Sequence, residues 1–172
     1  GSSGRTGYAD TSAPVNNISK KWELTYFEGG GGYASPSPAV INGSVYFANR
    51  TSVQSVDAQT GEILWTFSTD GYIESSPTVT NGTVYIGSND GNIYALDSRT
   101  GREQWSFQSG ADVRKAITTT EGRVYATNIG GRLFALDAHT GNPQWNNRID
   151  GAFITPLAAD DETLYIGTRE RL

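Results

Sequence analysis

The sequence predicts an all-β protein made of repeated four-stranded antiparallel sheets, the blades of a β-propeller. An eleven-residue pattern recurs at a spacing of forty residues, and short apolar-alternating segments lie between turn signals. Many Gly, Tyr, Thr and Val residues suit strands joined by tight turns. A four-stranded meander of about forty residues is the unit of a propeller, because each sheet buries its apolar faces only against its neighbours. About four units are expected, a partial propeller or a fragment of a larger ring.

The recurring pattern is most regular at Ala95–Trp105, returns at Ala135–Trp145, and begins with Ser rather than Ala at Ser55–Trp65. Its Asp and Thr can hydrogen-bond locally and hold a tight turn. Its Gly supplies a backbone angle that other residues resist. Its Trp brings a large apolar area and one N–H that needs an acceptor when buried. The residues assigned to this structural role are Trp22, Asp57, Thr60, Gly61, Trp65, Ala95, Asp97, Thr100, Gly101, Trp105, Ala135, Asp137, Thr140, Gly141 and Trp145.

The N-terminal residues 1–20 lack apolar periodicity and are expected to form a flexible leader. Two origins stay open: the remnant of a tag, or the tether that follows a lipidated cysteine in an exported lipoprotein. Lys21–Phe27 is predicted as a lone outer strand from its aromatic and β-branched content. It is a candidate to complete an incomplete terminal blade. Gly29–Gly32 is predicted as a loop with no stiffness of its own. It is not interpreted as a phosphate-binding loop, because no lysine follows it and no helix begins after it.

The first unit, residues 33–68, is expected to hold four strands. Asn42-Gly43 separates the first two, and both residues tolerate the positive φ of a type I′ hairpin turn. The predicted strands are Ala34–Ile41, Ser44–Ala48, Val53–Asp57 and Glu62–Ser68.

Two further units follow the same plan, and a last unit is incomplete. Unit two, residues 73–108, has predicted strands Ile73–Thr80, Thr83–Ser88, Asn92–Asp97 and Arg102–Gln108. Unit three, residues 113–147, has Val113–Thr120, Arg123–Asn128, Arg132–Asp137 and Asn142–Asn147. The last unit, residues 153–172, has only Phe153–Ala159 and Thr163–Thr168.

Composition excludes several classes of function. The net charge of −5 disfavours nucleic acid, whose phosphates need clustered Lys and Arg. The chain has no Cys, which removes disulfides, thiolate nucleophiles and thiolate metal sites. No apolar run approaches the length of a membrane span. The acidity otherwise favours solubility more than any specific partner.

Candidate catalytic and metal-binding residues have simpler structural interpretations. His139 falls in the turn of the recurring pattern and is interpreted as a solvated turn residue. Asp160-Asp161-Glu162 could supply oxygens to Ca²⁺, but it occupies the turn position of Asn42-Gly43. Asn89-Asp90-Gly91 lacks the other ligands of a calcium-binding loop and is interpreted as a hairpin turn. No catalytic, cofactor-binding or metal-binding residue is assigned.

Positions that differ between otherwise regular repeats are the places where function can be grafted. Arg114 and Lys115 stand where the preceding unit has Glu74 and Ser75. They are a candidate patch for an anionic ligand or a protein partner, and a solvated edge is the alternative. Tyr33 and Tyr72, near the loops between units, would suit a sugar-binding or polymer-binding surface.

The pattern Ala-x-Asp-x-x-Thr-Gly-x-x-x-Trp resembles the tryptophan-docking motif of PQQ-like β-propeller repeats, a family that includes BamB-like scaffolds and quinoprotein dehydrogenases. The resemblance covers Lys21–Leu172. It implies that each Trp docks on the backbone of the neighbouring blade, and that the protein is extracytoplasmic, either secreted or lipid-anchored. Closed rings of this family have about seven to eight blades. The four units are therefore expected to form an open arc, or to self-associate through exposed blade faces.

Three functions follow from this resemblance. The favoured one is a non-catalytic scaffold or protein-binding module. The first alternative is a fragment of a PQQ-dependent quinoprotein dehydrogenase, for which PQQ and calcium would be the cofactors. Such alcohol dehydrogenases commonly carry a vicinal Cys pair, a calcium site and a catalytic Asp, whereas this sequence has no Cys. The second alternative is a carbohydrate-binding or polymer-binding propeller.

Overall fold

The structure is a computed structural model, and it describes residues 20–23, 36–153, 155–160 and 163–169. Within these ranges the chain forms three four-stranded antiparallel sheets, each a meander in sequence order. The first holds β1 (Ala39–Ile41), β2 (Ser44–Asn49), β3 (Ser52–Asp57) and β4 (Ile63–Ser68). The second holds β5 (Thr78–Thr80), β6 (Thr83–Gly87), β7 (Asn92–Asp97) and β8 (Glu103–Gln108). The third holds β9 (Thr118–Thr120), β10 (Arg123–Thr127), β11 (Arg132–Asp137) and β12 (Pro143–Arg148).

The last unit is an interrupted hairpin made of two short ladders. Its strands are β13 (Ala152–Phe153), β14 (Ala158–Ala159), β15 (Leu164–Tyr165) and β16 (Thr168–Arg169). β13 pairs with β16, and β14 pairs with β15. Both predicted strands of this unit are therefore broken into two parts.

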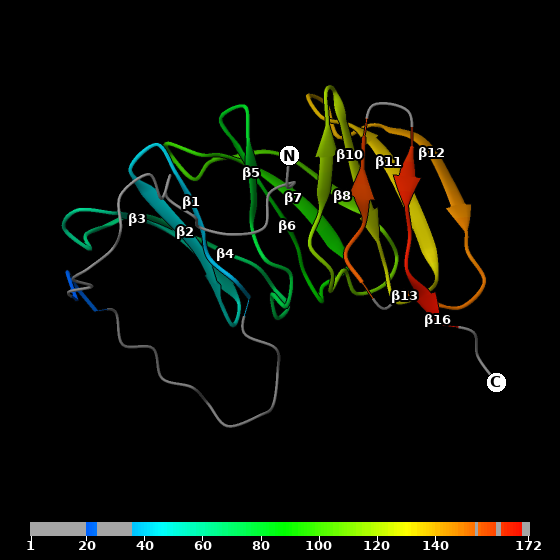
Figure 1. Cartoon of the computed structure of the whole chain (residues 1–172), viewed down its shortest axis with the longest axis horizontal. Helices are drawn as coiled ribbons and strands as arrows, with labels where there is room; N and C mark the ends of the chain where they lie inside the picture. The colour runs from blue at the N-terminus through cyan, green and yellow to red at the C-terminus, as the bar shows by residue number, and fades with distance from the viewer. Residues whose placement is uncertain (1–19, 24–35, 154, 161–162, 170–172) are drawn as a thin grey trace, which may run out of the picture.

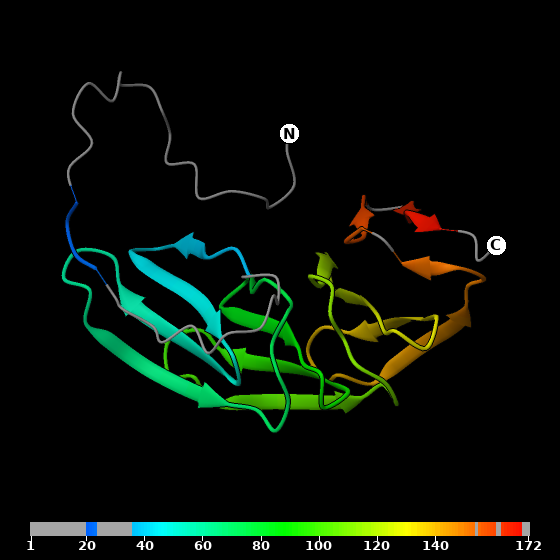
Figure 2. The same ribbon diagram turned by 90° about the horizontal axis from the view of Figure 1, so that it is seen from below.

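The sheets lie side by side in chain order and fan out in an arc (Figure 1). The first strands of the units contact one another on the inner side, and the fourth strands lie on the outer side (Figure 2). This arrangement confirms the predicted all-β fold, a partial β-propeller of antiparallel four-stranded blades. No helix of the described residues is long and apolar enough to span a membrane.

The apolar cores lie between neighbouring blades. One cluster joins Val84 and Ile86 of β6 to Tyr46 and Val53 of the first sheet. Two further clusters join the second sheet to the third and the third sheet to the last unit. Each blade therefore depends on its neighbour to remove its faces from water.

The Asn-Gly turns have the predicted geometry. Asn42 and Gly43 have φ values of 49° and 78°, and Asn81 and Gly82 have 47° and 78°. Positive φ at both central residues defines the type I′ turn, whose twist matches that of the flanking strands. In the third unit only Gly122 of the Glu121-Gly122 pair has a positive φ.

The first strand of each complete unit is shorter than predicted, with three residues rather than eight. In the second unit the buried Ser75 side chain takes over the pairing, because its Oγ donates to the Gly87 carbonyl and accepts from the Gly87 N–H, both at 2.8 Å. Ile73 donates instead to the carbonyl of Arg50 in the preceding blade. Pro77 has no N–H to offer a ladder. Residues 73–77 of the predicted strand thus connect the first two blades rather than extend β5.

The predicted strand Lys21–Phe27 is only partly described. Lys21, Trp22 and Glu23 belong to no strand ladder, and residues 24–27 lie outside the described ranges. The other predicted features outside those ranges are the leader up to Ser19, the Gly29–Gly32 loop, Tyr33, Asp161 and Glu162.

Candidate functional site

The Asp of the recurring pattern organises the turn between the third and fourth strands of each blade. Asp97 Oδ1 accepts hydrogen bonds from the Thr100 hydroxyl at 2.7 Å, the Thr100 N–H at 2.8 Å and the Arg99 N–H at 3.1 Å. These bonds lower the pKa of Asp97, with the Thr100 hydroxyl as the largest cause. Asp57 and Asp137 accept the same three bonds, and their pKa values are also lowered.

This turn receives the Trp of the preceding blade. Trp65 Nε1 donates to the Ser98 carbonyl at 2.9 Å, and Trp105 Nε1 donates to the Ala138 carbonyl at 3.1 Å. The indole of Trp65 also covers Gly101, where a Cβ atom would lie 2.6 Å from the ring. Both tryptophans are largely buried, with exposed fractions of 9% and 8%. Each contact therefore joins one blade to the next through an apolar surface and one hydrogen bond.

In the first two blades a tyrosine from the second strand reaches the same carbonyl, a contact that the sequence reasoning missed. The hydroxyl of Tyr46 donates to Ser98 O at 3.1 Å, and that of Tyr85 donates to Ala138 O at 3.2 Å. The rings of Tyr46 and Trp65 lie 5.9 Å apart. The signal was present, since tyrosines recur here at the repeat spacing, but the spacing alone does not tell which group they contact.

The two terminal tryptophans differ. Trp22 Nε1 donates to the Ala58 carbonyl at 3.0 Å, so the first complete blade receives a Trp from the segment before it. Trp145 contacts Tyr125, but its side chain is 39% exposed, and its Nε1 makes no hydrogen bond with a described residue.

The first residue of the recurring pattern lies opposite the Trp in the neighbouring strand. Ala95 pairs with Trp105, and Ser55 pairs with Trp65. Both small side chains are fully buried. The Ser55 hydroxyl has no hydrogen-bond partner among the residues that the structure describes, so the copy that departs from Ala places an unsatisfied polar atom in the core.

The opposite edge of the blades carries the residues that differ between repeats. It consists of the β2–β3, β6–β7 and β10–β11 turns together with the segments that connect successive blades, residues 69–77 and 109–117, and we call it the connection edge. Main-chain hydrogen bonds join its parts: Asn89 N–H to Tyr72 O at 2.8 Å, and Ile129 N–H to Asp112 O at 2.9 Å. Through these bonds each connecting segment is held against a turn of the blade that follows it.

The predicted patch residues Arg114 and Lys115 lie on the connection edge. Arg114 Nη2 lies 2.7 Å from Asp112 Oδ2, and its Nε lies 3.8 Å from Glu74 Oε1 of the preceding blade. Glu74 in turn accepts a hydrogen bond from Asn89 Nδ2 at 2.7 Å. The charge of Arg114 is thus compensated within an ordered polar row that crosses two blades. Lys115 is half-buried at the position that Ser75 takes in the preceding unit.

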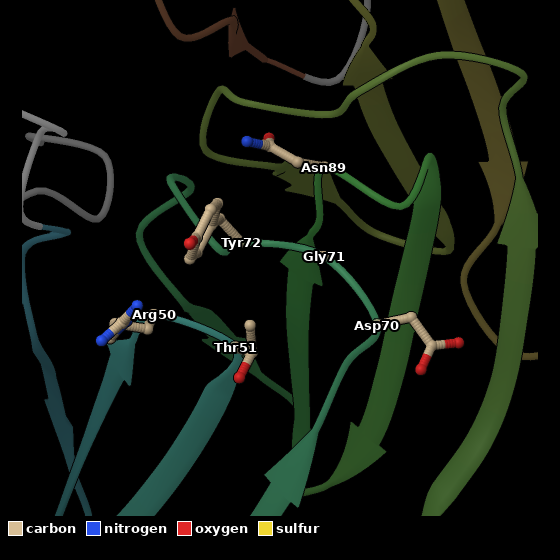
Figure 3. Close-up of a pocket in the computed structure, with 6 residues that line it drawn as sticks. All are labelled: Arg50, Thr51, Asp70, Gly71, Tyr72 and Asn89. Carbon is tan, nitrogen blue, oxygen red and sulfur yellow. The ribbon is translucent and has the colours of Figure 1, made fainter. Parts of the chain in front are cut away.

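A hollow of about 720 Å³ lies on the same edge, between the first two blades. Arg50 and Tyr72 lie together on one side of it, with the guanidinium carbon 5.9 Å from the ring centroid, whereas Asp70 points away from them (Figure 3). Asn89 closes a further side (Figure 3). Its Nδ2 is held by Glu74, but its buried Oδ1 has no hydrogen-bond partner within the described part of the chain. The lining residues are Arg50, Thr51, Asp70, Gly71, Tyr72 and Asn89.

Asp90 organises the turn between β6 and β7 through local hydrogen bonds. Its Oδ1 accepts from the Asn92 N–H at 2.8 Å, and its Oδ2 accepts from the Tyr94 hydroxyl at 2.9 Å. Burial and the hydrogen bond to Asp90 raise the pKa of Tyr94 to about 12. The hydroxyl therefore stays protonated and holds the turn at ordinary pH.

The remaining candidate residues also lie in turns. The His139 N–H donates to Asp137, and the carboxylate of Asp160 accepts from the Thr163 N–H at 2.7 Å. Among the residues that the structure describes, no group of three or more His, Cys, Asp or Glu side chains could hold a metal ion.

Comparison with solved structures places the fold among propellers. BamB from Moraxella catarrhalis superposes with a TM-score of 0.69 at 22% identity, over 77% of this chain and 42% of that one. A quinohemoprotein alcohol dehydrogenase from Pseudomonas putida HK5 superposes with a TM-score of 0.69 at 21% identity, over 78% and 28% of the two chains. The computationally designed Ika4 protein superposes with a TM-score of 0.72 at 19% identity, over 86% and 92%. The matched part is thus less than half of the two natural chains.

Sequence comparison identifies the family. No protein of curated function matches the sequence significantly. A family model described as the outer membrane protein assembly factor BamB matches residues 13–119 and 109–171, which is most of the chain. Together with the repeated blades described above, this match means that the chain belongs to the PQQ-like, BamB-type family of β-propeller repeats.

Proposed function

We propose that the chain is a non-catalytic propeller module that binds other proteins outside the cytoplasm through its connection edge. The observation that carries the proposal is the row Asn89–Glu74–Arg114–Asp112, which is ordered by side-chain contacts across two blades. An exposed aromatic or aliphatic side chain lies at each end of this row, with Tyr72 38% exposed and Ile129 53% exposed.

This composition suits a protein interface better than a solvated edge. Tyr and Arg are enriched among the residues that dominate binding energy, and polar groups around an apolar contact supply specificity. The row is held before any partner arrives, so little side-chain freedom is lost on binding. The name of the matching family model, an assembly factor, agrees with a role in contacting other proteins.

Capture of partners by edge variants tests the proposal. We expect Ile129→Ser to reduce capture of proteins from an extracytoplasmic fraction several-fold, as measured by quantitative mass spectrometry. Leu64→Ser is the matched control, because Leu64 is 51% exposed but lies on the outer strand β4. Equal capture by both variants and the parent would contradict binding at the connection edge.

The dehydrogenase alternative makes a different prediction. Titration with PQQ and Ca²⁺ should give no saturable absorbance change and no dye-linked alcohol oxidation if the module is non-catalytic. Saturable PQQ uptake would replace the scaffold proposal with the enzymatic one.

Self-association through the blade face around Trp145 belongs to the same proposal. Its indole is 39% exposed, whereas those of Trp65 and Trp105 are 9% and 8% exposed. Light scattering at high protein concentration tests this point, and Trp145→Ser should lower the apparent mass. A monomer at all concentrations would contradict it.

A further inference from the structure

We propose that Asn42 is an acceptor site for an N-linked oligosaccharide. Three Asn-x-Ser/Thr tripeptides, the sequence that N-glycosylating enzymes require, lie in the described part of the chain. They are Asn42-Gly43-Ser44, Asn49-Arg50-Thr51 and Asn81-Gly82-Thr83. A fourth, Asn17-Ile18-Ser19, lies outside the described residues. The inference rests on the proposed location outside the cytoplasm, because acceptor tripeptides of this kind are used in secreted proteins.

The Asn42-Gly43 turn presents its asparagine to solvent. Both residues are exposed, and no atom lies within 4 Å of the position that a Cβ atom on Gly43 would take. The side-chain amide of Asn42 makes no hydrogen bond with a described residue. A bulky oligosaccharide on Asn42 Nδ2 can therefore extend into open space without displacing a packed group.

The hydroxyl two residues after the asparagine distinguishes the first blade from the second. Ser44 is half-buried, and its hydroxyl makes no hydrogen bond within the described part of the chain. Thr83, the equivalent residue in the second blade, is 8% exposed and donates to Gln104 Oε1 at 3.1 Å. The hydroxyl that the enzyme must recognise is thus available beside Asn42 and already bonded beside Asn81.

The tripeptide that begins at Asn49 is held in a strand and its hairpin turn. Asn49 is the last residue of β2, is half-buried and pairs with Ser52 of β3, whose hydroxyl donates to the Asn49 carbonyl at 3.2 Å. The next residue, Arg50, lies over the ring of Tyr72. The Asn49 side chain is therefore less accessible to an enzyme than that of Asn42.

The position of Asn42 keeps an oligosaccharide away from the connection edge. The Ala58 N–H donates to Gly43 O at 2.9 Å, so this turn lies beside the Asp57–Gly61 turn of the same blade. Both turns are on the edge opposite to the connection edge. The modification thus leaves the surface proposed for protein binding uncovered.

The transfer is a substitution at the anomeric carbon of a sugar that is carried by a polyprenyl pyrophosphate. Asn42 Nδ2 forms the new carbon–nitrogen bond and loses one proton. The bond between the anomeric carbon and the phosphate oxygen breaks, and the lipid pyrophosphate leaves with that electron pair. The exchange needs no oxidant or reductant.

The experiment uses the folded full chain, a single-subunit oligosaccharyltransferase that accepts Asn-x-Ser/Thr, and a lipid-linked oligosaccharide. Glycopeptide mass spectrometry should show the oligosaccharide on Asn42 and not on Asn49. Ser44→Ala should abolish transfer to Asn42, because it removes the recognised hydroxyl, whereas Ser44→Thr should retain it.

The second blade provides a matched comparison. Gln104→Ala removes the acceptor of the Thr83 hydroxyl, so it should raise the rate of transfer to Asn81 by about two- to tenfold, the size of one hydrogen bond. Transfer to Asn42 should stay as in the parent. An unchanged rate at Asn81 would contradict the structural selection of Asn42.

Three further results would overturn the inference. They are no oligosaccharide on Asn42, transfer to Asn42 only after the chain has been denatured, and transfer that survives Ser44→Ala. The second would mean that the folded turn is closed to the enzyme. The assay is cell-free and does not depend on where the protein resides or on its capture of partners, so this inference and the proposed function can fail separately.

Discussion

The indole of Trp65 lies directly against Gly101 of the next blade, and a Cβ atom on that glycine would fall 2.6 Å from the ring. Gly101 also has a φ of 70°, a conformation that L side chains resist. Two separate requirements, backbone conformation and space, therefore select glycine at one position. The same holds for Gly141 beneath Trp105.

Substitution of two glycines separates these requirements. Gly82 has a φ of 78°, and no atom lies within 4 Å of the position that a Cβ atom would take there. Gly82→Ala should therefore destabilise the folded protein by about 1–2 kcal/mol through the backbone conformation alone. Gly101→Ala adds the collision with Trp65, which should destabilise by about 1–3 kcal/mol more. Urea denaturation of both variants measures the difference, and equal losses would mean that the indole moves aside without penalty.

Removal of a buried indole tests the proposal that the tryptophans fasten neighbouring blades. Trp105 is 8% exposed and donates to Ala138 O, so Trp105→Ala should destabilise by about 3–5 kcal/mol. Trp145→Ala is the matched variant in the next blade and should lose clearly less, because Trp145 is 39% exposed. Thermal melts compare the two, and an unchanged melt for Trp105→Ala would refute the role.

The repeat spacing predicted the fold because each blade is encoded by the same kinds of local sequence feature. The forty-residue period, the Asn-Gly turns and the alternating strands all depend on residues close in sequence. The first strands were predicted too long because apolar residues such as Ile73 and Val113 continue the strand pattern. In the structure their N–H groups bond to the preceding blade, at Arg50 O and Ser88 O, and local periodicity cannot reveal that choice of partner.

The candidate site was predictable only in part for the same reason. Arg114 was singled out because it breaks the repeat, but its pairing with Glu74 spans two blades. The hollow brings Arg50, Tyr72 and Asn89 together from a turn, a connecting segment and a second turn. These turns and connecting segments lack the apolar alternation that marks the strands, so only the packing of blades places their side chains together.

Two buried serines should respond to alanine in opposite directions. The Ser55 hydroxyl is fully buried and finds no hydrogen-bond partner among the described residues, and the equivalent residues in the other blades are Ala95 and Ala135. Ser55→Ala should therefore stabilise the protein by about 1–3 kcal/mol. Ser75 is equally buried but bonds twice to Gly87, so Ser75→Ala should destabilise by a similar amount, about 1–3 kcal/mol. Denaturant midpoints measure both, and the same sign for the two variants would contradict the hydrogen-bond assignment.

Acid should weaken the turns between the third and fourth strands of the three complete blades, because each turn is organised by an aspartate. Hydrogen bonds lower the pKa of Asp57, Asp97 and Asp137 in the folded state from an ordinary value of 3.8. A carboxyl with a depressed folded pKa contributes stability that is fully present above the unfolded pKa and is lost as pH falls through the folded pKa. Denaturant midpoints should therefore be insensitive to these groups near neutral pH and fall with acid below about pH 4.

The Thr100 hydroxyl provides the specific test of this acid response. It is the largest cause of the lowered pKa of Asp97, so Thr100→Val should bring that pKa back towards 3.8. The variant should be less stable than the parent at neutral pH, and the gap should narrow as the pH falls below 3.8, because Asp97 then becomes protonated in both proteins. A gap that stays constant from neutral pH to pH 2.5 would show that the hydroxyl stabilises the turn independently of the charge on Asp97.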